Sequence, residues 1–264
     1  MYNPQKRSDK KPITTQDGST TLYSAEFDEC YHSTRDGALH ESLTKHVIPA
    51  LTLQANKKHL TILDICFGLG YNTLATLHYI RREALPVKVH ILSPEFDEAL
   101  VRSLATFDYP VEFEDLRPVI EAISRDGHYE DEQFRIDIYL GDARDVLGRW
   151  KMEDGGLKMD VVYQDAFSPA KNPLLWTREW FADIRSMCAE DAVLTTYSVA
   201  AATRMGLHEN GFALYEYQAE ETRKSLIASP SAIALDRLNL TPIDMALKMA
   251  RNPEARSLRD ADFV

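Results

Sequence analysis

Apolar residues recur along this chain in two patterns, short runs of strand length and longer stretches with helical spacing. The short runs predict buried strands at Leu60–Asp64, Val87–Leu92, Phe134–Leu140, Met159–Gln164 and Ala192–Thr196. Stretches with apolar positions three or four residues apart follow these runs and predict helices at 72–83, 97–105, 142–150, 176–187 and 199–209. This alternation predicts an α/β fold, in which helices cover both faces of a largely parallel sheet.

The N-terminal part of the chain has patterns of its own. Asp17 and Gly18 lie between threonine-rich arms and predict a β-hairpin over Thr14–Ser24. A helix is predicted over Ala38–Leu51. We expect residues 1–58 to form an extension that packs on the core.

Toward the C-terminus, Phe212–Tyr217 and Arg223–Ser229 predict two strands that form an antiparallel edge of the sheet. Thr241 and Pro242 predict the start of a last helix, with a cap followed by proline at the first helical position. These signals place the core at 59–235 and a helical tail at 236–264.

The stretch Leu60–Thr73 combines a buried strand, a glycine turn and the start of a helix. Gly68 and Gly70 let a ligand approach the backbone, and the first helical N–H groups face it. Asn72 and Thr73 are candidate caps of this helix. A strand, a glycine turn and a helix also occur together for purely structural reasons, so a ligand site is one of two interpretations.

The spacing of this turn excludes two phosphate-binding motifs. The dinucleotide fingerprint G-x-G-x-x-G fails because Cys66 stands at its first glycine and the third is missing, and no Gly-Lys-Ser/Thr follows. The D/E-x-G-x-G-x-G pattern of class I S-adenosyl-L-methionine (SAM) methyltransferases fits better, with cysteine at its first glycine. The cofactor-binding candidates in this stretch are Asp64, Cys66, Phe67, Gly68, Gly70 and Asn72.

Acidic residues end the next two predicted strands. Glu95 can bind the two hydroxyls of a ribose, or it can simply open the next helix, whose dipole favours an acid there. Asp142, followed by Ala143, can accept a hydrogen bond from an adenine amino group or cap its own helix.

A second informative stretch runs from Asp165 to Pro173, DAFSPAKNP. Two prolines make it a rigid loop, because proline interrupts both helix and central strand. Open α/β sheets bind ligands beyond the C-terminal ends of their strands, where this loop lies. Its carboxylate, aromatic ring and lysine therefore make it a second candidate part of the site.

The net charge of −11 argues against a protein that binds nucleic acid through its overall charge. The segment 95–165 has 19 acidic and 8 basic residues, whereas the rest of the chain has 22 of each. Any nucleic acid should therefore approach the side of the protein that this acidic segment does not occupy. Candidate contacts there are Lys6, Arg7, Lys10, Lys11, Arg35, Lys171, Arg178, Arg223 and Lys224.

Composition gives the remaining expectations. The three cysteines are far apart and no C-x-x-C is present, which favours a reduced cytoplasmic protein without structural zinc. His32, His40 and His46 lack the spacing of a metal site. No apolar run reaches the length of about 20 residues that crosses a membrane.

These motifs together resemble the methyltransferase domain of MnmC-type tRNA-modification proteins, in a stand-alone form without the FAD-dependent oxidase half. The segment DAFSPAKNPLLWT is the most specific match, supported by D-G-S-x-T-L-x-S, F-D-E-x-Y-H-S and T-Y-S. The resemblance implies a Rossmann-like class I methyltransferase fold, SAM as cofactor and the anticodon region of tRNA as substrate. It covers about 17–229, and Cys66 is a departure, because the fused family has glycine there.

The resemblance also implies a reaction, N-methylation of the 5-aminomethyl group on wobble uridine, with no metal. Asp165 is then the carboxylate that holds or receives the ammonium proton. Phe167 and Tyr197 become candidates to pack against the flipped uracil, unless they belong to the core. Lys171 and Lys224 are candidate substrate contacts. A separate FAD-dependent oxidase would supply the aminomethyl group.

Three alternatives remain at this point. A SAM-dependent methyl- or aminopropyltransferase acting on a small amine also suits the acidic composition. A non-catalytic module that binds SAM or tRNA would bind without turnover. An NAD-linked dehydrogenase is disfavoured by the missing third glycine.

Overall fold

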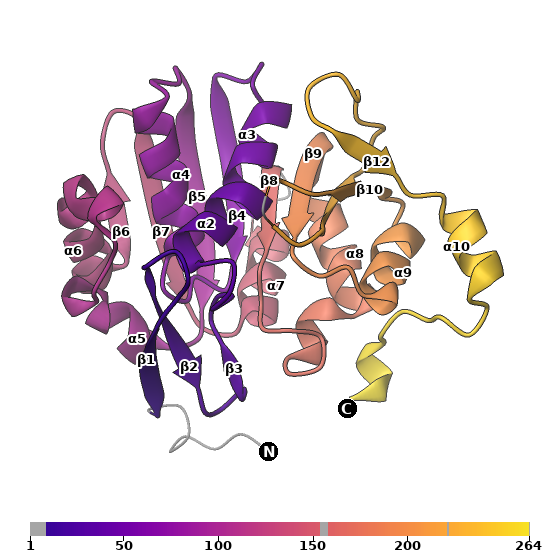
Figure 1. Ribbon diagram of the computed structural model, residues 1–264, viewed down its shortest axis with the longest axis horizontal. Helices are drawn as coiled ribbons and strands as arrows, with labels where there is room; N and C mark the ends of the chain where they lie inside the picture. Colours follow the sequence, from indigo (N-terminus) through magenta and orange to yellow (C-terminus); the bar gives the residue numbers. More distant parts are fainter. Residues whose placement is uncertain (1–8, 154–157, 221, 264) are drawn as a thin grey trace.

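The computed structural model describes residues 9–153, 158–220 and 222–263. Within these residues, three strands form a small sheet and nine form a large one (Figure 1). The small sheet consists of β1 (Lys10–Thr14), β2 (Thr20–Ser24) and β3 (Glu29–Cys30). From edge to edge, the large sheet consists of β12 (Leu240–Pro242), β10 (Ala213–Tyr217), β11 (Ser225–Ser229), β9 (Cys188–Thr196), β8 (Met159–Gln164), β4 (His59–Ile65), β5 (Lys88–Glu95), β7 (Phe134–Leu140) and β6 (His128–Glu130).

The five central strands of the large sheet, β9, β8, β4, β5 and β7, are parallel. β11 and β10 add the expected antiparallel edge beside β9, and the short β6 pairs antiparallel with β7 at the other edge. The chain fills one half of the sheet from β4 to β7 and then returns to β8 on the other side of β4. Such a reversal of strand order opens a crevice at the C-terminal ends of the strands.

Helices cover both faces of the large sheet, as the sequence predicts. One face carries α2 (Ala38–Glu41), η1 (Ser42–Val47), α3 (Ile48–Leu53), α4 (Tyr71–Arg82), α5 (Glu98–Ser103), η2 (Leu104–Thr106), η3 (Val111–Leu116) and α6 (Arg117–Asp126). The other carries α7 (Ala143–Glu153), η4 (Pro173–Trp176), α8 (Arg178–Met187) and α9 (Ala201–Glu209). The C-terminal segment adds α10 (Met245–Arg251) and η5 (Asp260–Asp262).

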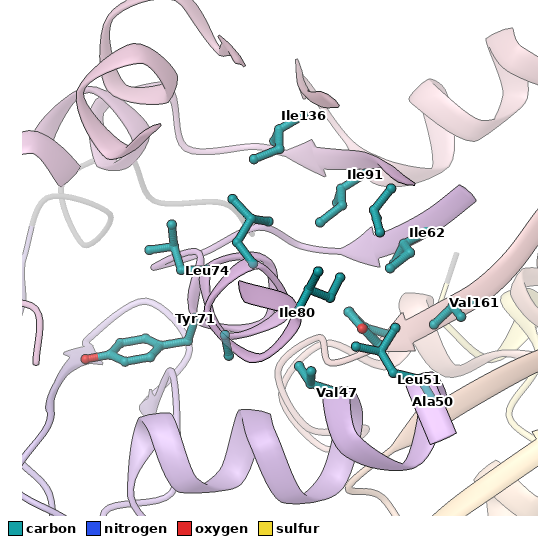
Figure 2. Packing of buried hydrophobic residues seen from close by; sticks show 14 of the residues in the cluster. Val47, Ala50, Leu51, Ile62, Tyr71, Leu74, Ile80, Ile91, Ile136 and Val161 are labelled. Carbon is teal, nitrogen blue, oxygen red and sulfur yellow. The ribbon is translucent and has the colours of Figure 1, made fainter. Parts of the chain in front are cut away.

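The strand β4 shows how the two faces divide the core. Leu60 and Ile62 pack with the helices of the first face, while Leu63 and Ile65 pack with those of the second. Figure 2 shows Ile62 in the first cluster, near side chains of α4 and of the N-terminal helix. Burying an aliphatic side chain of this size contributes about 1.5–3 kcal/mol. The strand that carries the glycine turn is therefore fixed from both sides.

The predicted N-terminal hairpin and helix are both present. β1 and β2 pair across a turn in which Asp17 accepts hydrogen bonds from Thr15 and Ser19. The predicted helix is continuous from α2 through α3, and its middle segment, η1, is π-helical. It packs on α4 (Figure 2), which holds the N-terminal extension against the core.

The prediction for the start of the last helix is wrong. Thr241 and Pro242 belong to β12, which pairs with β10, and Asp244 caps α10 by accepting a hydrogen bond from the Leu247 N–H. β12 lies in the segment predicted as a helical tail, so that segment contributes a strand to the large sheet. The pairing with β10 decides the structure here, which local capping signals do not report.

None of the helices in the described part of the chain is both long and apolar enough to cross a membrane. Lys6 and Arg7, two of the candidate nucleic-acid contacts, lie outside the described residues.

Candidate active site

The turn between β4 and α4 has the conformation of a close-approach loop. Cys66, Gly68 and Gly70 all have positive φ, at 64°, 55° and 72°. A Cβ at Gly70 would lie 2.7 Å from the ring of Phe67, and one at Gly68 would lie 3.1 Å from Tyr31. Both positions therefore require glycine, whereas Cys66 adopts a conformation that side chains rarely take.

Asn72 and Thr73 do not cap α4, contrary to the prediction. The residue before the helix is Gly70, which is left-handed and provides no side-chain cap. Asn72 instead donates a hydrogen bond from Nδ2 to Asp165 Oδ2 at 2.8 Å. Thr73 donates from Oγ1 to Asp64 Oδ2 at 2.7 Å. The first turn of α4 thus orients two carboxylates.

The carboxylate of Glu95 lies at the end of β5, next to this turn. Its oxygens accept hydrogen bonds from the backbone N–H groups of Gly68, at 2.8 Å, and Asp97, at 2.6 Å. Burial raises the pKa of Glu95, and these N–H groups oppose that shift. The residue that opens the next helix is Asp97, which caps α5. Glu95 itself faces the cavity described next.

A cavity of about 490 Å³ lies over the C-terminal ends of β4 and β5. Nine of the predicted site residues line it, namely Cys66, Phe67, Gly68, Asn72, Glu95, Asp142, Ala143, Asp165 and Phe167. Asp64 and Gly70 lie beneath it, as the support of Thr73 and the start of α4. Asp142 accepts a hydrogen bond from the backbone of Arg144, and so acts as a cap as well as a lining residue.

A second cavity, of about 350 Å³, meets the first at Tyr31, His32, Asp165 and Phe167. Tyr197 lines only this second cavity, and its hydroxyl donates to the carbonyl of Ala166 at 2.9 Å. Phe167 is stacked on Phe27, with 4.3 Å between ring centroids. Both predicted aromatic residues are half-buried and border the second cavity.

Asp165 lies where the two cavities meet. Burial raises the pKa of this carboxyl, but the neighbouring His46 and His32 and the Asn72 amide outweigh burial, and the net pKa is lowered. Asp165 is therefore ionised at neutral pH. An ionised carboxylate between two cavities can bind a cationic group entering from either one.

The pKa of Asp64 is shifted in the opposite direction. Burial raises its pKa to about 7, and the nearby charge of Asp165 adds to this effect, while the hydrogen bond from Thr73 opposes it. The two carboxyl groups therefore have pKa values that are pushed apart, which is common where acid and base roles are separated.

The two lysines predicted as substrate contacts, Lys171 and Lys224, lie outside both cavities. Lys171 pairs with Asp28 at 2.8 Å, and Lys224 pairs with Glu216 at 2.6 Å. Among the other candidate contacts, Arg178 pairs with Glu209 and Arg223 pairs with Asp36. Arg35 lines the second cavity and forms no ion pair within the described residues.

The sequence analysis missed the part of the site that the N-terminal extension provides. Tyr31 and His32 line both cavities, Glu29 accepts hydrogen bonds from the backbone and hydroxyl of Ser168, and His46 lies against Asp165. The sequence pattern places His46 near the apolar face of the predicted helix and gives no sign that it meets Asp165. No group of three or more metal-ligating side chains is placed to hold an ion within the described residues.

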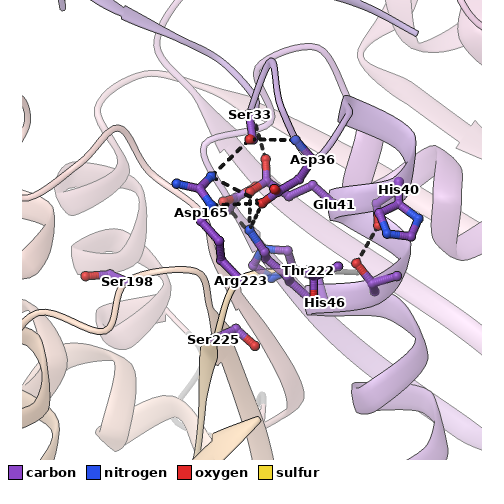
Figure 3. Close-up of polar contacts among 12 residues, drawn as sticks. Ser33, Asp36, His40, Glu41, His46, Asp165, Ser198, Thr222, Arg223 and Ser225 are labelled. Atoms are coloured by element: carbon purple, nitrogen blue, oxygen red, sulfur yellow. Dashed lines mark hydrogen bonds and ion pairs between the residues drawn. The ribbon is translucent and has the colours of Figure 1, made fainter. Parts of the chain in front are cut away.

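A hydrogen-bonded network of charged side chains lies beside the second cavity, and its members Glu41 and Arg223 line that cavity (Figure 3). The buried Lys45 donates to Asp36 and Glu41, both at 2.7 Å. Asp36 also accepts from Arg223, and Arg223 donates to Ser33. This network joins the N-terminal extension to the segment that leads into β11.

Comparison with known proteins relates this geometry to methyltransferases. A family described as S-adenosyl-L-methionine-dependent methyltransferase matches residues 116–230. The crystal structure of MNMC2 from Aquifex aeolicus matches with a TM-score of 0.79 and 32% identity, over 99% of this chain and 82% of that chain.

Curated relatives share shorter parts of their length with this chain. The bifunctional protein MnmC of tRNA 5-methylaminomethyl-2-thiouridine biosynthesis from Pseudoalteromonas atlantica is 27% identical over 82% of this chain and 33% of its own length. An uncharacterized protein from Methanocaldococcus jannaschii is 28% identical over 81% of this chain and 57% of its own. The chain thus spans between a third and three-fifths of the length of these relatives.

Proposed function

This chain belongs to the MnmC2 family of SAM-dependent methyltransferases, and we propose that it methylates the amino nitrogen of a 5-aminomethyl group on wobble uridine in tRNA. The product would be 5-methylaminomethyluridine or its 2-thio form. The observation that carries this proposal is the ionised carboxylate of Asp165 between two cavities, which suits a cationic amine as the acceptor.

The larger cavity has the size and chemistry that SAM requires. Its volume of about 490 Å³ falls within the usual range of small-molecule sites. The buried Oδ1 of Asn72 has no hydrogen-bond partner among the described residues, so it can accept from an amino group of a ligand. Gly68 and Glu95 bring backbone and carboxylate to the same wall. Bound SAM supplies an electrophilic methyl group.

We assign the smaller cavity to the acceptor base. The flipped pyrimidine would lie between Phe167 and Tyr197, because enzymes that act on a nucleobase hold it against aromatic surfaces outside the stack. Asp165 would then bind the aminomethyl nitrogen and orient it toward the larger cavity. Positioning of this kind supplies most of the rate in a bimolecular transfer.

Ion pairs change the proposal for the tRNA-binding surface. Lys171, Arg178 and Lys224 each have an acidic partner, so a phosphate must compete with a carboxylate at these positions. Arg35 is exposed and lines the acceptor cavity, which makes it the favoured phosphate contact beside the flipped base. We also propose that a FAD-dependent oxidase activity forms the aminomethyl group before this chain acts.

The test is mass spectrometry of tRNA nucleosides after incubation with SAM. tRNA that carries 5-aminomethyluridine should yield a nucleoside heavier by one methylene unit, and ribonuclease treatment beforehand should abolish transfer. Transfer to free polyamines or small amines in place of tRNA would overturn the proposal in favour of a small-molecule methyltransferase. SAM binding without any transfer would indicate a non-catalytic module.

A further inference from the structure

His46 is a fully buried histidine on the π-helical segment η1, and it faces the carboxylate of the proposed acceptor site. Its Nε2 lies 3.4 Å from Asp165 Oδ1, and its Nδ1 lies 2.9 Å from Thr195 Oγ1 (Figure 3 shows His46 and Asp165). π-Helical turns within α-helices occur frequently at functional sites. The ring is thus fixed at one nitrogen and faces a functional carboxylate with the other.

Within the described part of the chain, the carboxylate placed close to Nε2 is that of Asp165, at 3.4 Å. Nε2 forms no hydrogen bond within the described residues, although the ring is buried. The distance of 3.4 Å to Asp165 exceeds the 2.7–2.9 Å, approximately, of a charge-assisted N–H···O bond. Either partner of the bond between Nδ1 and Thr195 Oγ1 can be the donor. Proton uptake at Nε2 requires the tautomer in which Nδ1–H donates, so that Nε2 presents a lone pair to the carboxylate. His46 and Asp165 can share one added proton when the distance between Nε2 and Oδ1 shortens to that of a hydrogen bond.

The groups that face His46 come from several elements. Asp165 follows β8, Tyr163 lies on β8 with its ring 5.8 Å away, Asp64 lies on β4, and His32 follows β3. On the helix of His46 itself, Lys45 is held by Asp36 and Glu41. Asp165 is the carboxylate among these groups that also faces both cavities.

We propose that His46 is a positioning residue for methyl transfer, which takes up through Asp165 the proton that the acceptor ammonium must lose. This inference depends on the proposed function, because it requires a protonated amine as the acceptor. The ammonium N–H bond breaks, and its electron pair stays on nitrogen as the lone pair that attacks the methyl group. The proton forms an O–H bond on Asp165 and then an N–H bond on His46 Nε2, so no other reactant is needed.

The chemistry explains why a second group is useful. A carboxylate is a weaker base than an imidazole, so Asp165 alone is a poor final acceptor for the proton. A carboxylate that binds an ammonium ion also favours the protonated amine. An imidazole behind the carboxylate gives the proton a better final position, and general-base assistance of this kind is worth about 10²–10⁴-fold.

The decisive experiment compares the pH profiles of wild type, His46→Gln and the control His40→Gln, which alters a histidine on α2 away from Asp165. We expect His46→Gln to lower kcat about 10²-fold near neutral pH, with the KM for SAM unchanged. The deficit should shrink as pH rises, because the amine then loses its proton to water. A loss by the same factor at every pH would overturn the proposal and indicate a structural role.

A second measurement uses the protein without substrate. ¹⁵N NMR of the histidine rings should show His46 as the neutral form with a proton on Nδ1, and the Nε2 signal should change in Asp165→Asn. Thr195→Val, which removes the partner of Nδ1, should redistribute the proton between the two nitrogens. A proton on Nε2 in the neutral ring would overturn the proposal even if His46→Gln does not fold. Wild-type protein that fails to methylate aminomethyl-tRNA would instead overturn the proposed function, and the NMR result would still stand.

Discussion

Asn72 and Asp165 are joined by a hydrogen bond of 2.8 Å, although 93 positions separate them in the sequence. The bond connects the first turn of α4 to the loop after β8. It fixes Oδ2 of the carboxylate, while Oδ1 faces His46. The orientation of the proposed catalytic group therefore depends on α4, which follows the turn that we propose to bind SAM, and on the N-terminal helix that carries His46.

Replacing Asp165 should separate binding from transfer. Asp165→Asn removes the charge that binds the ammonium, so we expect kcat for aminomethyl-tRNA to fall by about 10²–10⁴-fold. The SAM dissociation constant, measured by calorimetry, should change much less. Asp183→Asn on the exposed part of α8 is the matched control. Retention of wild-type kcat in Asp165→Asn would contradict the assigned role.

Two glycine substitutions should have opposite effects on stability. Gly70→Ala places a Cβ 2.7 Å from Phe67 at a positive φ, so we expect it to lower the free energy of unfolding by about 1–3 kcal/mol and to weaken SAM binding. Gly148→Ala lies in α7 with open space around it, and should raise that free energy by about 0.4–1 kcal/mol. Thermal and urea unfolding measure both. Equal effects of the two substitutions would exclude a special conformation at Gly70.

Asp64 should make stability depend on pH. Its pKa is raised from 3.8 to about 7 in the folded protein, mainly by burial. Between these values the folded state holds a proton that the unfolded state has lost, so stability falls as pH rises through this window. Relative to Asp64→Asn, wild type should lose about 1.4 kcal/mol for each pH unit. Urea unfolding of both proteins between pH 4 and pH 7, with Asp108→Asn as an exposed control, is the measurement. A constant difference across the window would show that Asp64 is ionised throughout.

Arg35 should contribute to tRNA affinity through phosphate contact. Arg35→Glu is expected to weaken binding and to reduce the slope of log K against log salt by about 1. Lys248→Glu on α10, at the far end of the molecule in Figure 1, should leave this slope unchanged. Binding titrations at several salt concentrations compare the two. An unchanged slope for Arg35→Glu would place the tRNA on another surface.

Local pattern was sufficient to predict most of the large sheet. Phe134–Leu140 and Met159–Gln164 form strands with the predicted bounds, because their apolar alternation matches burial between two helical layers. The glycine turn was found because positive φ and a close ring demand small residues. These features depend on residues that are close together in the sequence, so one sequence is enough to predict them.

The parts that were missed depend on distant partners. β12 forms because β10 offers an unpaired edge, although Thr241 and Pro242 resemble a helix start. His46 contacts Asp165 only after the N-terminal helix packs on α4, so the local sequence gives no signal of this contact beyond a histidine at a buried helical position. Local pattern likewise predicts Asn72 as a helix cap, because its actual partner, Asp165, follows a strand much later in the chain.

The two edge strands of the large sheet, β12 and β6, limit how the protein can aggregate in concentrated solution. β12 and β6 are three residues long, and β12 ends in Pro242, which has no N–H to offer. A strand from another molecule would find too few free backbone groups at either margin to extend the ladder. Short edge strands therefore disfavour edge-to-edge aggregation of the large sheet. Truncation before residue 240 would remove β12 and leave β10 as an exposed edge strand.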